Sequence, residues 1–414
     1  MTHEIRAVAS DRDREAVRAL LRSEFEVAPG VGAAFSDLYD DLLDHDPSVS
    51  YECSRVALEK GNVVGHALLA PRDIRICEGD CPAGLIGLVV VHPAFQGIGV
   101  GTALIEDVHR VARERALGLM VLAGDPAFYN RFGYRDTFVK TECVLAVKHA
   151  HSAVTNTLRP AALTDLDSLV KLSARSVPSG SVSPSSERWE WILKTGHPVR
   201  LLETNPVMLG HLALHDRCLI DEEGAGYVRI AIGDERATVY EAGLVRGAEK
   251  RMLGQILALC GQEGVRELNL RLSPENGLVR VTEQPARIQP DVEFQFKIID
   301  LDVLLEVVQP GLEGRIERGF PGWKGGILIQ TESSCIHVCR ESGSLELRNI
   351  NEGQSAVASS GSIRIPEWGV GRSLMGQDDL IRALESSETS TDLDLALGAL
   401  FRSPLPEFLL SDAI

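Results

Sequence analysis

The amino-acid sequence predicts a protein of the α/β (α+β) class, with two successive domains of similar layout and a third α+β domain. One observation is a buried strand that runs through a glycine loop into a helix, a crossover typical of folds with a central mixed sheet. Another is an internal repeat, because the order of elements in the first part of the chain returns in the second. Length is the last, since 414 residues exceed what one ordinary core can organise. We therefore expect domains over residues 1–150, 151–295 and 296–414.

The first domain begins with a short strand at residues 4–8 and a helix that Ser10 can cap. An acidic amphipathic helix is predicted next, at residues 34–46. Two β-rich runs joined by a Lys-Gly-Asn turn then indicate a hairpin at residues 55–76. The crossover follows at residues 89–105. A buried strand, a short helix or turn, and a closing strand complete the domain, at residues 117–124, 125–137 and 138–147.

The second domain repeats this order after residue 150. Its strand, helix, hairpin with strand, helix and final strand are expected at residues 157–161, 163–174, 223–245, 247–264 and 265–273, with a Ser/Pro-rich loop at 176–186. In the third domain strands precede helices. The strands are expected at residues 325–331, 333–341 and 344–349, and the helices at 376–386 and 393–401. The apolar, proline-containing end at 403–414 suggests a docked tail.

The composition excludes several classes of function. The formal net charge of −17 argues against a nucleic-acid partner, which needs a basic face. No apolar run approaches the roughly 18 residues that span a bilayer, so we expect no membrane partner. The charged N-terminus has no apolar signal-peptide region, which predicts a cytoplasmic protein. The close cysteine pairs, Cys77/Cys81 and Cys335/Cys339, lack a second pair at zinc-site spacing, so we expect reduced thiols and no metal.

The glycine loop is the strongest local signal. A glycine-bearing turn that opens a helix directs backbone N–H groups at one point, where they and the helix dipole favour an anion. Gly101-Thr102-Ala103 lacks the lysine of a nucleotide-hydrolase phosphate loop. Thr102 also stands where the dinucleotide fingerprint requires glycine or alanine. By itself the loop could equally be a tight strand-to-helix turn.

The pattern Gln96-Gly97-Ile98-Gly99-Val100-Gly101, after a strand and "HP", resembles the pyrophosphate loop of the GNAT (GCN5-related N-acetyltransferase) superfamily, which binds acetyl-CoA. The segment "GDPAFYNRFGY" is similar to a tyrosine-bearing segment of one GNAT branch. The whole layout resembles the enhanced-intracellular-survival (Eis) family, which has two tandem GNAT-like domains and a terminal domain similar to sterol carrier protein 2 (SCP2). "LRPAALTDLDSLVKL", "IRIPEWGVGRSLMG" and "LGALFRSPLPEFLLSDAI" carry that likeness. It implies a homo-oligomer, a hexamer.

The resemblance implies which residues bind the acetyl donor. The backbone of Val89, Val90 and Val91 would pair with the pantetheine arm, and one N–H would polarise the thioester carbonyl. Gly124 and Asp125 match positions that line the coenzyme. The amides expected to hold the phosphates are those of Gly97, Ile98, Gly99, Val100, Gly101 and Thr102.

Acetyl transfer to an amine needs an acid and a base. Tyr129 matches the family's general acid, although it could also simply pack in an aromatic cluster; Tyr134 is expected to be structural. Many GNAT enzymes carry a glutamate base on the central strand, but "LIGLVVV" contains no acid. In the Eis family the base is the C-terminal carboxylate, which maps to Ile414, where the family residue is aromatic. Asp412 through a water, or His92, are alternatives, and the tail could be inert.

The expected function is therefore transfer of acetyl from acetyl-CoA to a primary amine of an aminoglycoside, polyamine or lysine-type acceptor. The acceptor could instead be a protein amine, or the chain could be a CoA- or lipid-binding module without turnover. The acidic stretch from Asp37 to Asp46 could form a negative rim for polyamine-like substrates or a solvated face. The second domain is expected to be structural, because only Gly247 falls near a loop position and Glu249 would repel phosphate.

Overall fold

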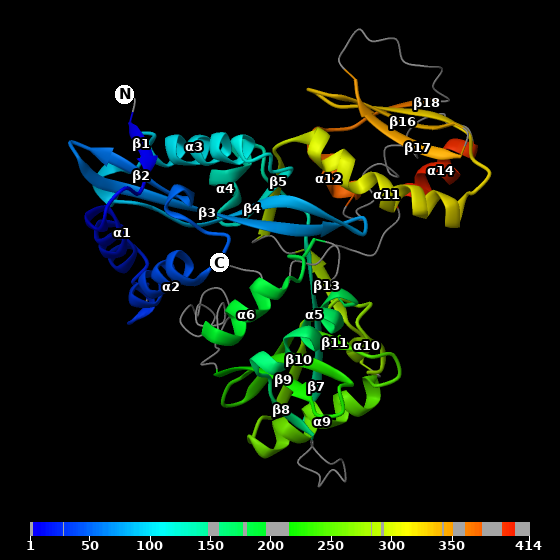
Figure 1. Cartoon of the computed structure of the whole chain (residues 1–414), viewed down its shortest axis with the longest axis horizontal. Coiled ribbons are helices and arrows are strands. Elements are labelled where there is room, and N and C mark those ends of the chain that lie inside the picture. Colours follow the sequence, from blue (N-terminus) through cyan, green and yellow to red (C-terminus); the bar gives the residue numbers. More distant parts are fainter. Residues whose placement is uncertain are drawn as a thin grey trace.

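The computed structural model describes residues 3–27, 29–147, 157–176, 180–195, 215–282, 284–290, 294–341, 343–350, 361–374 and 391–401. Within these ranges the strands form three sheets, each accompanied by helices (Figure 1). The predicted helix at 376–386 and the tail at 403–414 lie outside the described residues.

The first sheet contains seven strands in the described part of the chain. They are β1 (Glu4–Ala7), β2 (Ser54–Glu59), β3 (Asn62–Ile76), β4 (Gly79–Val91), β5 (Leu119–Ala123), β6 (Arg135–Asp136) and β14 (Phe294–Ile298). Their order is β1-β2-β3-β4-β5-β14-β6. The accompanying helices are α1 (Asp11–Glu24), α2 (Val31–His45), α3 (Val100–Glu114) and α4 (Pro126–Tyr129), with short 3-10 turns η1 (Tyr51–Cys53), η2 (Pro93–Phe95) and η3 (Asn130–Phe132).

Helices cover both faces of the first sheet (Figure 1). Helix α1 begins where predicted, because the Ser10 hydroxyl accepts a hydrogen bond from the Asp13 amide at 3.2 Å. Its apolar stripe buries Val17, Leu20 and Leu21, each contributing about 1.5–3 kcal/mol of transfer free energy. Helices α1 and α2 pack on one face of the sheet and share a hydrophobic core with it. Helix α3 packs on the opposite face, in a separate core. The sheet is thus held rigidly between two helical layers.

The second sheet repeats the layout. Its strands are β7 (Val139–Ala146), β8 (Leu158–Pro160), β9 (His215–Asp221), β10 (Gly226–Ile232), β11 (Arg236–Leu244), β12 (Glu267–Leu270) and β13 (Arg287–Pro290). They run in the order β13-β7-β12-β11-β10-β9-β8. Its helices are η4 (Leu163–Asp165), α5 (Leu166–Ala174), α6 (Ser186–Thr195), α9 (Glu249–Gln262) and α10 (Gly277–Arg280). The predicted repeat therefore extends to the order of helices and strands.

The third sheet has four strands within the described residues, in the order β17-β16-β15-β18. These are β15 (Gly325–Gln330), β16 (Cys335–Glu341), β17 (Ser344–Asn349) and β18 (Gly361–Arg364), accompanied by α11 (Leu301–Gly319), α12 (Glu367–Leu374) and α14 (Thr391–Phe401). Helix α11 connects this part to the rest of the molecule. The carbonyl of Cys77, in the β3–β4 turn, would lie 1.6 Å from a Cβ on Gly311, so glycine permits close packing there.

Two strands lie in sheets that chain order did not suggest. Strand β7 was expected to close the first domain, but it pairs with β12 and β13 in the second sheet. Strand β14 lies at the predicted 295/296 boundary and pairs with β5 and β6 in the first sheet. Each sheet thus receives a strand from the neighbouring segment, which ties the first two parts of the chain together.

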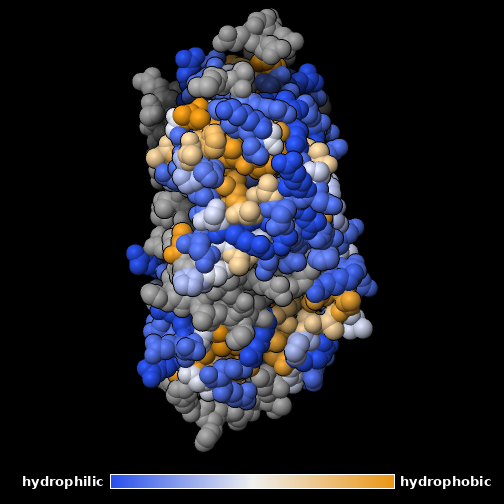
Figure 2. All heavy atoms as spheres, turned by 90° about the vertical axis from the view of Figure 1, so that its left-hand side faces the viewer, coloured by the Kyte–Doolittle hydropathy of each residue, from blue (hydrophilic) through white to orange (hydrophobic). Residues whose placement is uncertain are grey.

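The surface and the thiols have simple descriptions. Figure 2 shows a mostly hydrophilic face, with apolar side chains gathered mainly in its upper half. Among the helices that the structure describes, none has the length and apolarity needed to cross a membrane. All eight cysteines are free thiols. Within the described residues, no group of three or more His, Cys, Asp or Glu side chains could hold a metal ion.

Candidate active site

Strands β4 and β5 run side by side and then separate. Their last paired residues are Ile86 and Leu122, and β5 ends at Ala123. Strand β4 continues to Val91, so residues 87–91 have no partner on β5. An extended ligand can pair with an open strand edge of this kind through main-chain hydrogen bonds. Residues 89–91, which the family resemblance assigns to the pantetheine arm, lie on this segment.

A β-bulge sets the direction of β4 at the separation. The pairing of β3 with β4 shifts register between His66 and Leu68, and Leu88 opposite has φ of 51°. Such a left-handed conformation is strained for a residue with a side chain, by about 1–2 kcal/mol. The fully buried His66 ring supports it, because Nδ1 lies 2.9 Å from the Leu88 carbonyl oxygen.

The His66 contact is the end of a buried polar chain. Its Nε2 lies 2.9 Å from Ser54 Oγ, and the Tyr39 hydroxyl lies 2.9 Å from the same oxygen. Because a carbonyl only accepts, Nδ1 must donate, and Nε2 accepts from Ser54. Burial lowers the pKa of His66 to about 4, so the ring is neutral at physiological pH. In the sequence, the only signal of His66 is a polar side chain within an apolar strand, and this does not predict its role.

The glycine loop has the geometry that its sequence predicts. Gly97 and Gly99 have φ of 75° and 96°, conformations that side chains rarely adopt. Gly99 is the N-cap of α3, where no side chain bonds the first amides. These N–H groups therefore stay available for an anion. The Gln96 amide nitrogen donates to the Val91 carbonyl at 2.9 Å, which fixes the loop to the end of β4.

Arg131 adds a cation that the sequence analysis did not identify. Its Nη2 donates to Thr102 Oγ1 at 3.0 Å, in the first turn of α3. The guanidinium stacks on Phe128 and Phe132, with distances of 4.2 and 4.8 Å to the ring centroids. A Cβ on Gly101 would lie 3.2 Å from Phe128 Cζ, so α3 and the aromatic cluster pack closely. Arg131 forms no ion pair with a described residue, and its charge lies beside Thr102 at the start of α3.

Tyr129 lies on α4, directly after β5. Asp125 caps this helix by accepting from the Ala127 amide at 2.9 Å. A Cβ on Gly124 would lie 2.3 Å from Tyr129 Cε2, so glycine is required beside the ring. Burial, with a smaller effect of Asp125, raises the pKa of Tyr129 to about 12. The phenol is therefore protonated at neutral pH, and its hydroxyl has no hydrogen-bond partner among the described residues.

The ring of Tyr129 packs edge-on against Phe128 and Tyr134, at centroid distances of 4.9 and 6.0 Å. Tyr134 itself is fully buried, and its hydroxyl lies 2.8 Å from His109 Nε2, an arrangement that suits a structural role. Strand β14 also supports this region, because Gln295 donates to the Gly124 carbonyl at 2.8 Å. The expected acid thus sits in an aromatic cluster with its polar end unpaired.

The remaining predicted residues have different outcomes. Ile414 and Asp412 lie outside the described residues. His92 precedes the loop, and its Nδ1 accepts from the Ala94 amide at 3.2 Å.

The acidic stretch on α2 is largely engaged in ion pairs. Arg14 contacts Asp40 and Asp44, each at 2.7 Å, and Arg72 pairs with Asp46. These contacts favour a structural role for the stretch over a rim for cationic substrates.

Comparisons with known proteins agree with this geometry. Residues 4–136 match the family described as acetyltransferase (GNAT) domain. Among curated sequences, none matches the chain. Among solved structures, a GCN5-related N-acetyltransferase from Kribbella flavida is 18% identical with a TM-score of 0.70, over 100% of this chain and 99% of that one.

Two further structures are similar over their full lengths. A GCN5-related N-acetyltransferase from Anabaena variabilis is 14% identical, with a TM-score of 0.69 over 100% of both chains. Eis1 from Mycobacterium abscessus is 15% identical, with a TM-score of 0.66 over 100% of both chains. At these identities the likeness concerns the fold. The match of residues 4–136 identifies this part of the chain as a GNAT acetyltransferase domain.

Proposed function

We propose that this protein is an N-acetyltransferase of the Eis type that transfers acetyl from acetyl-CoA to a primary amine of an aminoglycoside, a polyamine or a lysine side chain. The observation that carries the proposal is the position of Tyr129. A buried, protonated phenol follows β5 where β4 and β5 separate, and the glycine loop follows β4 at the same edge. This arrangement supports a proton donor and an anion site along one extended ligand path.

The donor would bind along that path. The pantetheine arm pairs with the backbone of residues 89–91, and Gly124 and Asp125 line its other side. The amides of residues 97–102 hold the pyrophosphate, and Arg131 adds a positive charge beside Thr102. This assignment uses only open main-chain groups and one cation, which is what a ligand with an amide arm and a diphosphate needs.

The transfer itself would be a direct attack. The amine nitrogen forms a bond to the thioester carbon, and a backbone N–H of β4 stabilises the charge on the carbonyl oxygen. The carbon–sulfur bond then breaks, and Tyr129 gives its proton to the departing thiolate. A phenol suits this step because burial keeps it protonated, and Tyr129 regains its proton from solvent.

The attacking amine must also lose a proton. The central strand "LIGLVVV" has no acidic side chain, so the base must come from elsewhere. We propose the C-terminal carboxylate of Ile414, with the SCP2-like third domain presenting it to the first. Asp412 acting through a water, and His92, are the alternatives, and the deletion described below separates the two tail residues from His92. We also propose a cytoplasmic hexamer with one working site per chain.

The test measures coenzyme A release from acetyl-CoA with a panel of aminoglycosides, polyamines and lysine peptides. Turnover with one class would establish the reaction and name the acceptor class. The Tyr129→Phe variant should lose 10²–10⁴-fold in kcat with little change in the KM for acetyl-CoA. Tyr134→Phe is the matched control, because its hydroxyl bonds His109 rather than the ligand path, and it should keep kcat. Equal kcat values for both variants would refute the role of Tyr129.

A second variant tests the base. Deleting residues 411–414 should abolish turnover while acetyl-CoA still binds. Turnover that survives the deletion would exclude Ile414 and Asp412 and leave His92, which His92→Gln then tests. Tight acetyl-CoA binding without turnover on any acceptor would instead favour a CoA-binding module.

A further inference from the structure

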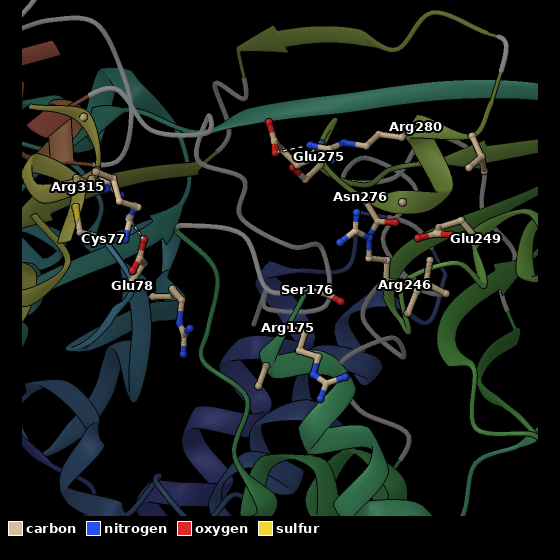
Figure 3. A pocket seen from close by; sticks show the side chains of 18 of the residues that line it. Cys77, Glu78, Arg175, Ser176, Arg246, Glu249, Glu275, Asn276, Arg280 and Arg315 are labelled. Carbon is tan, nitrogen blue, oxygen red and sulfur yellow. Dashed lines mark hydrogen bonds and ion pairs between the residues drawn. The ribbon is translucent and has the colours of Figure 1, made fainter. Parts of the chain in front are cut away.

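A large cleft lies where the three parts of the chain meet (Figure 3). Its volume is about 1150 Å³. One wall comes from the β3–β4 turn and α11, the other from the β11–α9 and β12–α10 connections, with the end of α5 between them. In Figure 3 Cys77, Glu78 and Arg315 lie on one side, and Arg246, Glu249 and Asn276 on the other. The proposed acetyl transfer uses none of these residues.

The second wall is the counterpart of the donor site in the first domain. Strands β11 and β12 pair last at Val239 and Leu270, and β11 then runs on to Leu244, as β4 does beyond β5. Gly247, with φ of 92°, precedes α9 as Gly99 precedes α3. Asn276 caps α10 by accepting from an amide at 3.0 Å, as Asp125 caps α4. The duplicated fold therefore retains a ligand cleft here.

The anion position at the start of α9 is already filled. Glu249 Oε1 accepts from the Gly247 amide at 3.0 Å, and backbone hydrogen bonds hold the pKa of this carboxyl below its usual value. The Glu249 Cγ also lies 2.5 Å from where a Cβ on Gly277 would stand. This carboxylate takes the place that a phosphate would occupy in the first domain. A coenzyme bound as in the first domain is therefore excluded, and any ligand must use other groups.

Those other groups are arginines. The lining includes Arg75, Arg175, Arg246, Arg280, Arg315 and Arg318. It includes only three carboxylates, each of them engaged: Glu78 pairs with Arg318 at 3.0 Å, Glu275 with Arg280 at 2.7 Å, and Glu249 with the backbone. Arg175 and Arg246 form no ion pair or hydrogen bond with a described residue. A positive cleft of this kind stands out in a chain with a net charge of −17.

We propose that this cleft binds a small phosphate-bearing anion with at least two negative charges, of the pyrophosphate or nucleoside-diphosphate class. Arg175 and Arg246 hold it from the second domain, and Arg315 and Arg318 face them from α11. Guanidinium groups bind phosphate through paired N–H donors, and several of them gathered in one concave site reinforce one another. The volume exceeds what a single phosphate needs. The site is independent of the acetyl-transfer site, so either assignment can fail alone.

Calorimetric titration of the full chain with inorganic pyrophosphate tests the proposal. The variants carry Gly99→Val, which weakens binding at the first-domain loop by introducing a side chain at φ of 96°. Pyrophosphate should still bind, and adding Arg175→Gln and Arg246→Gln should weaken this binding at least tenfold. The matched control is Arg236→Gln with Arg266→Gln, which removes the same charge from exposed ion pairs away from the cleft.

The outcomes decide the proposal. Binding that the cleft variant loses and the control keeps supports it. No binding to the Gly99→Val chain at millimolar pyrophosphate, or equal binding in the cleft variant and the control, overturns it. The same comparison in the wild-type background, where two sites should reduce to one, decides the matter if Gly99→Val does not fold. Acetyl transfer by a chain that carries only Arg175→Gln and Arg246→Gln, with Gly99 intact, should match the wild type, which separates this test from that of the proposed function.

Discussion

The bulge at Leu88 gives the sharpest test of how β4 is prepared for the donor. We predict that His66→Phe destabilises the first domain and slows acetyl transfer, although His66 is not expected to contact a substrate. Phenylalanine keeps an aromatic ring in the fully buried site and removes both nitrogen atoms. The Leu88 carbonyl then loses its bond from Nδ1, and Ser54 loses its acceptor at Nε2.

The magnitude follows from these two losses. A buried carbonyl left without its partner costs about 1–3 kcal/mol. Ser54 keeps its contact with the Tyr39 hydroxyl, so its loss is closer to about 1 kcal/mol. The sum, about 2–4 kcal/mol, corresponds to a fall of roughly 5–15 °C in the melting temperature. Without the hydrogen bond from Nδ1, Leu88 can also leave its left-handed conformation, which displaces residues 89–91.

The assay combines thermal unfolding with steady-state kinetics at a temperature where the variant stays folded. We expect kcat to fall at least tenfold, because the misplaced backbone N–H no longer stabilises the charge on the thioester oxygen. Tyr39→Phe is the control. It removes the far end of the same chain, so it should cost stability without changing kcat. A His66→Phe chain with wild-type melting temperature and kcat, or a Tyr39→Phe chain with an equal loss of kcat, would refute the reasoning.

Three further predictions concern the same domain. Burial lowers the pKa of His66 to about 4 and that of His109 to about 3, so below pH 6.5 the unfolded chain binds protons that the folded chain excludes. The free energy of unfolding should therefore fall by about 1.4 kcal/mol per pH unit for each histidine between pH 6.5 and about 4. Denaturant titrations at several pH values would check this. The dependence of this free energy on pH should be shallower for His66→Phe. Arg131→Gln should raise the KM for acetyl-CoA about three- to tenfold, because it removes the cation beside Thr102. The melting temperature should change little. An unchanged KM would show that this charge does not reach the donor. Gly124→Ala should lower kcat more than tenfold, because a Cβ 2.3 Å from Tyr129 Cε2 displaces the ring. Steady-state kinetics of this variant would test the prediction. Gly261→Ala is the control, because the nearest atom to a Cβ there is 3.9 Å away.

Local patterns made much of the first domain predictable. The Ser10 cap, the turn at Lys60 and Gly61, and the glycine loop are signalled by residues adjacent in sequence, and the structure places each as expected. Tyr129 was singled out by the resemblance of its segment to one GNAT branch, and its role as the acid stays a prediction, whereas the cap, the turn and the loop need no such resemblance. These features depend on backbone conformations that only a few residue types adopt, so a single sequence is enough to reveal them.

Long-range pairing was not predictable in this way. The predicted domain boundary at 295/296 falls within strand β14, yet this strand lies between β5 and β6 of the first sheet. Nothing in "FQFKI" specifies which open edge it joins, because any half-buried edge accepts a short apolar strand. The roles of His66 and Arg131 were not predicted from the sequence for a related reason. Each acts through one partner that is distant in sequence, at Leu88 and Thr102, and no motif records such a contact.

The second domain carries an acidic residue at the central-strand position where the first domain has none. Counted from the last paired residues of the separating strands, Glu241 on β11 takes the place that Leu88 has on β4. The chain therefore does carry an acid on a central strand, but in the domain whose anion position is filled by Glu249. Glu241 accepts from the Tyr227 hydroxyl at 2.7 Å and pairs with the fully buried Arg229 at 3.3 Å.

Glu241 therefore has a structural role. If its carboxylate accepted a proton, the buried charge of Arg229 would be left unpaired, at a cost of about 3–5 kcal/mol. The two domains thus share one layout of helices and strands but carry different parts of the expected site. The first has the open amides and Tyr129, the proposed acid, without a strand carboxylate, and the second has the strand carboxylate without open amides. Neither of these two domains combines the proposed acid with a strand carboxylate, so we expect the base on the third domain, with His92 as the alternative.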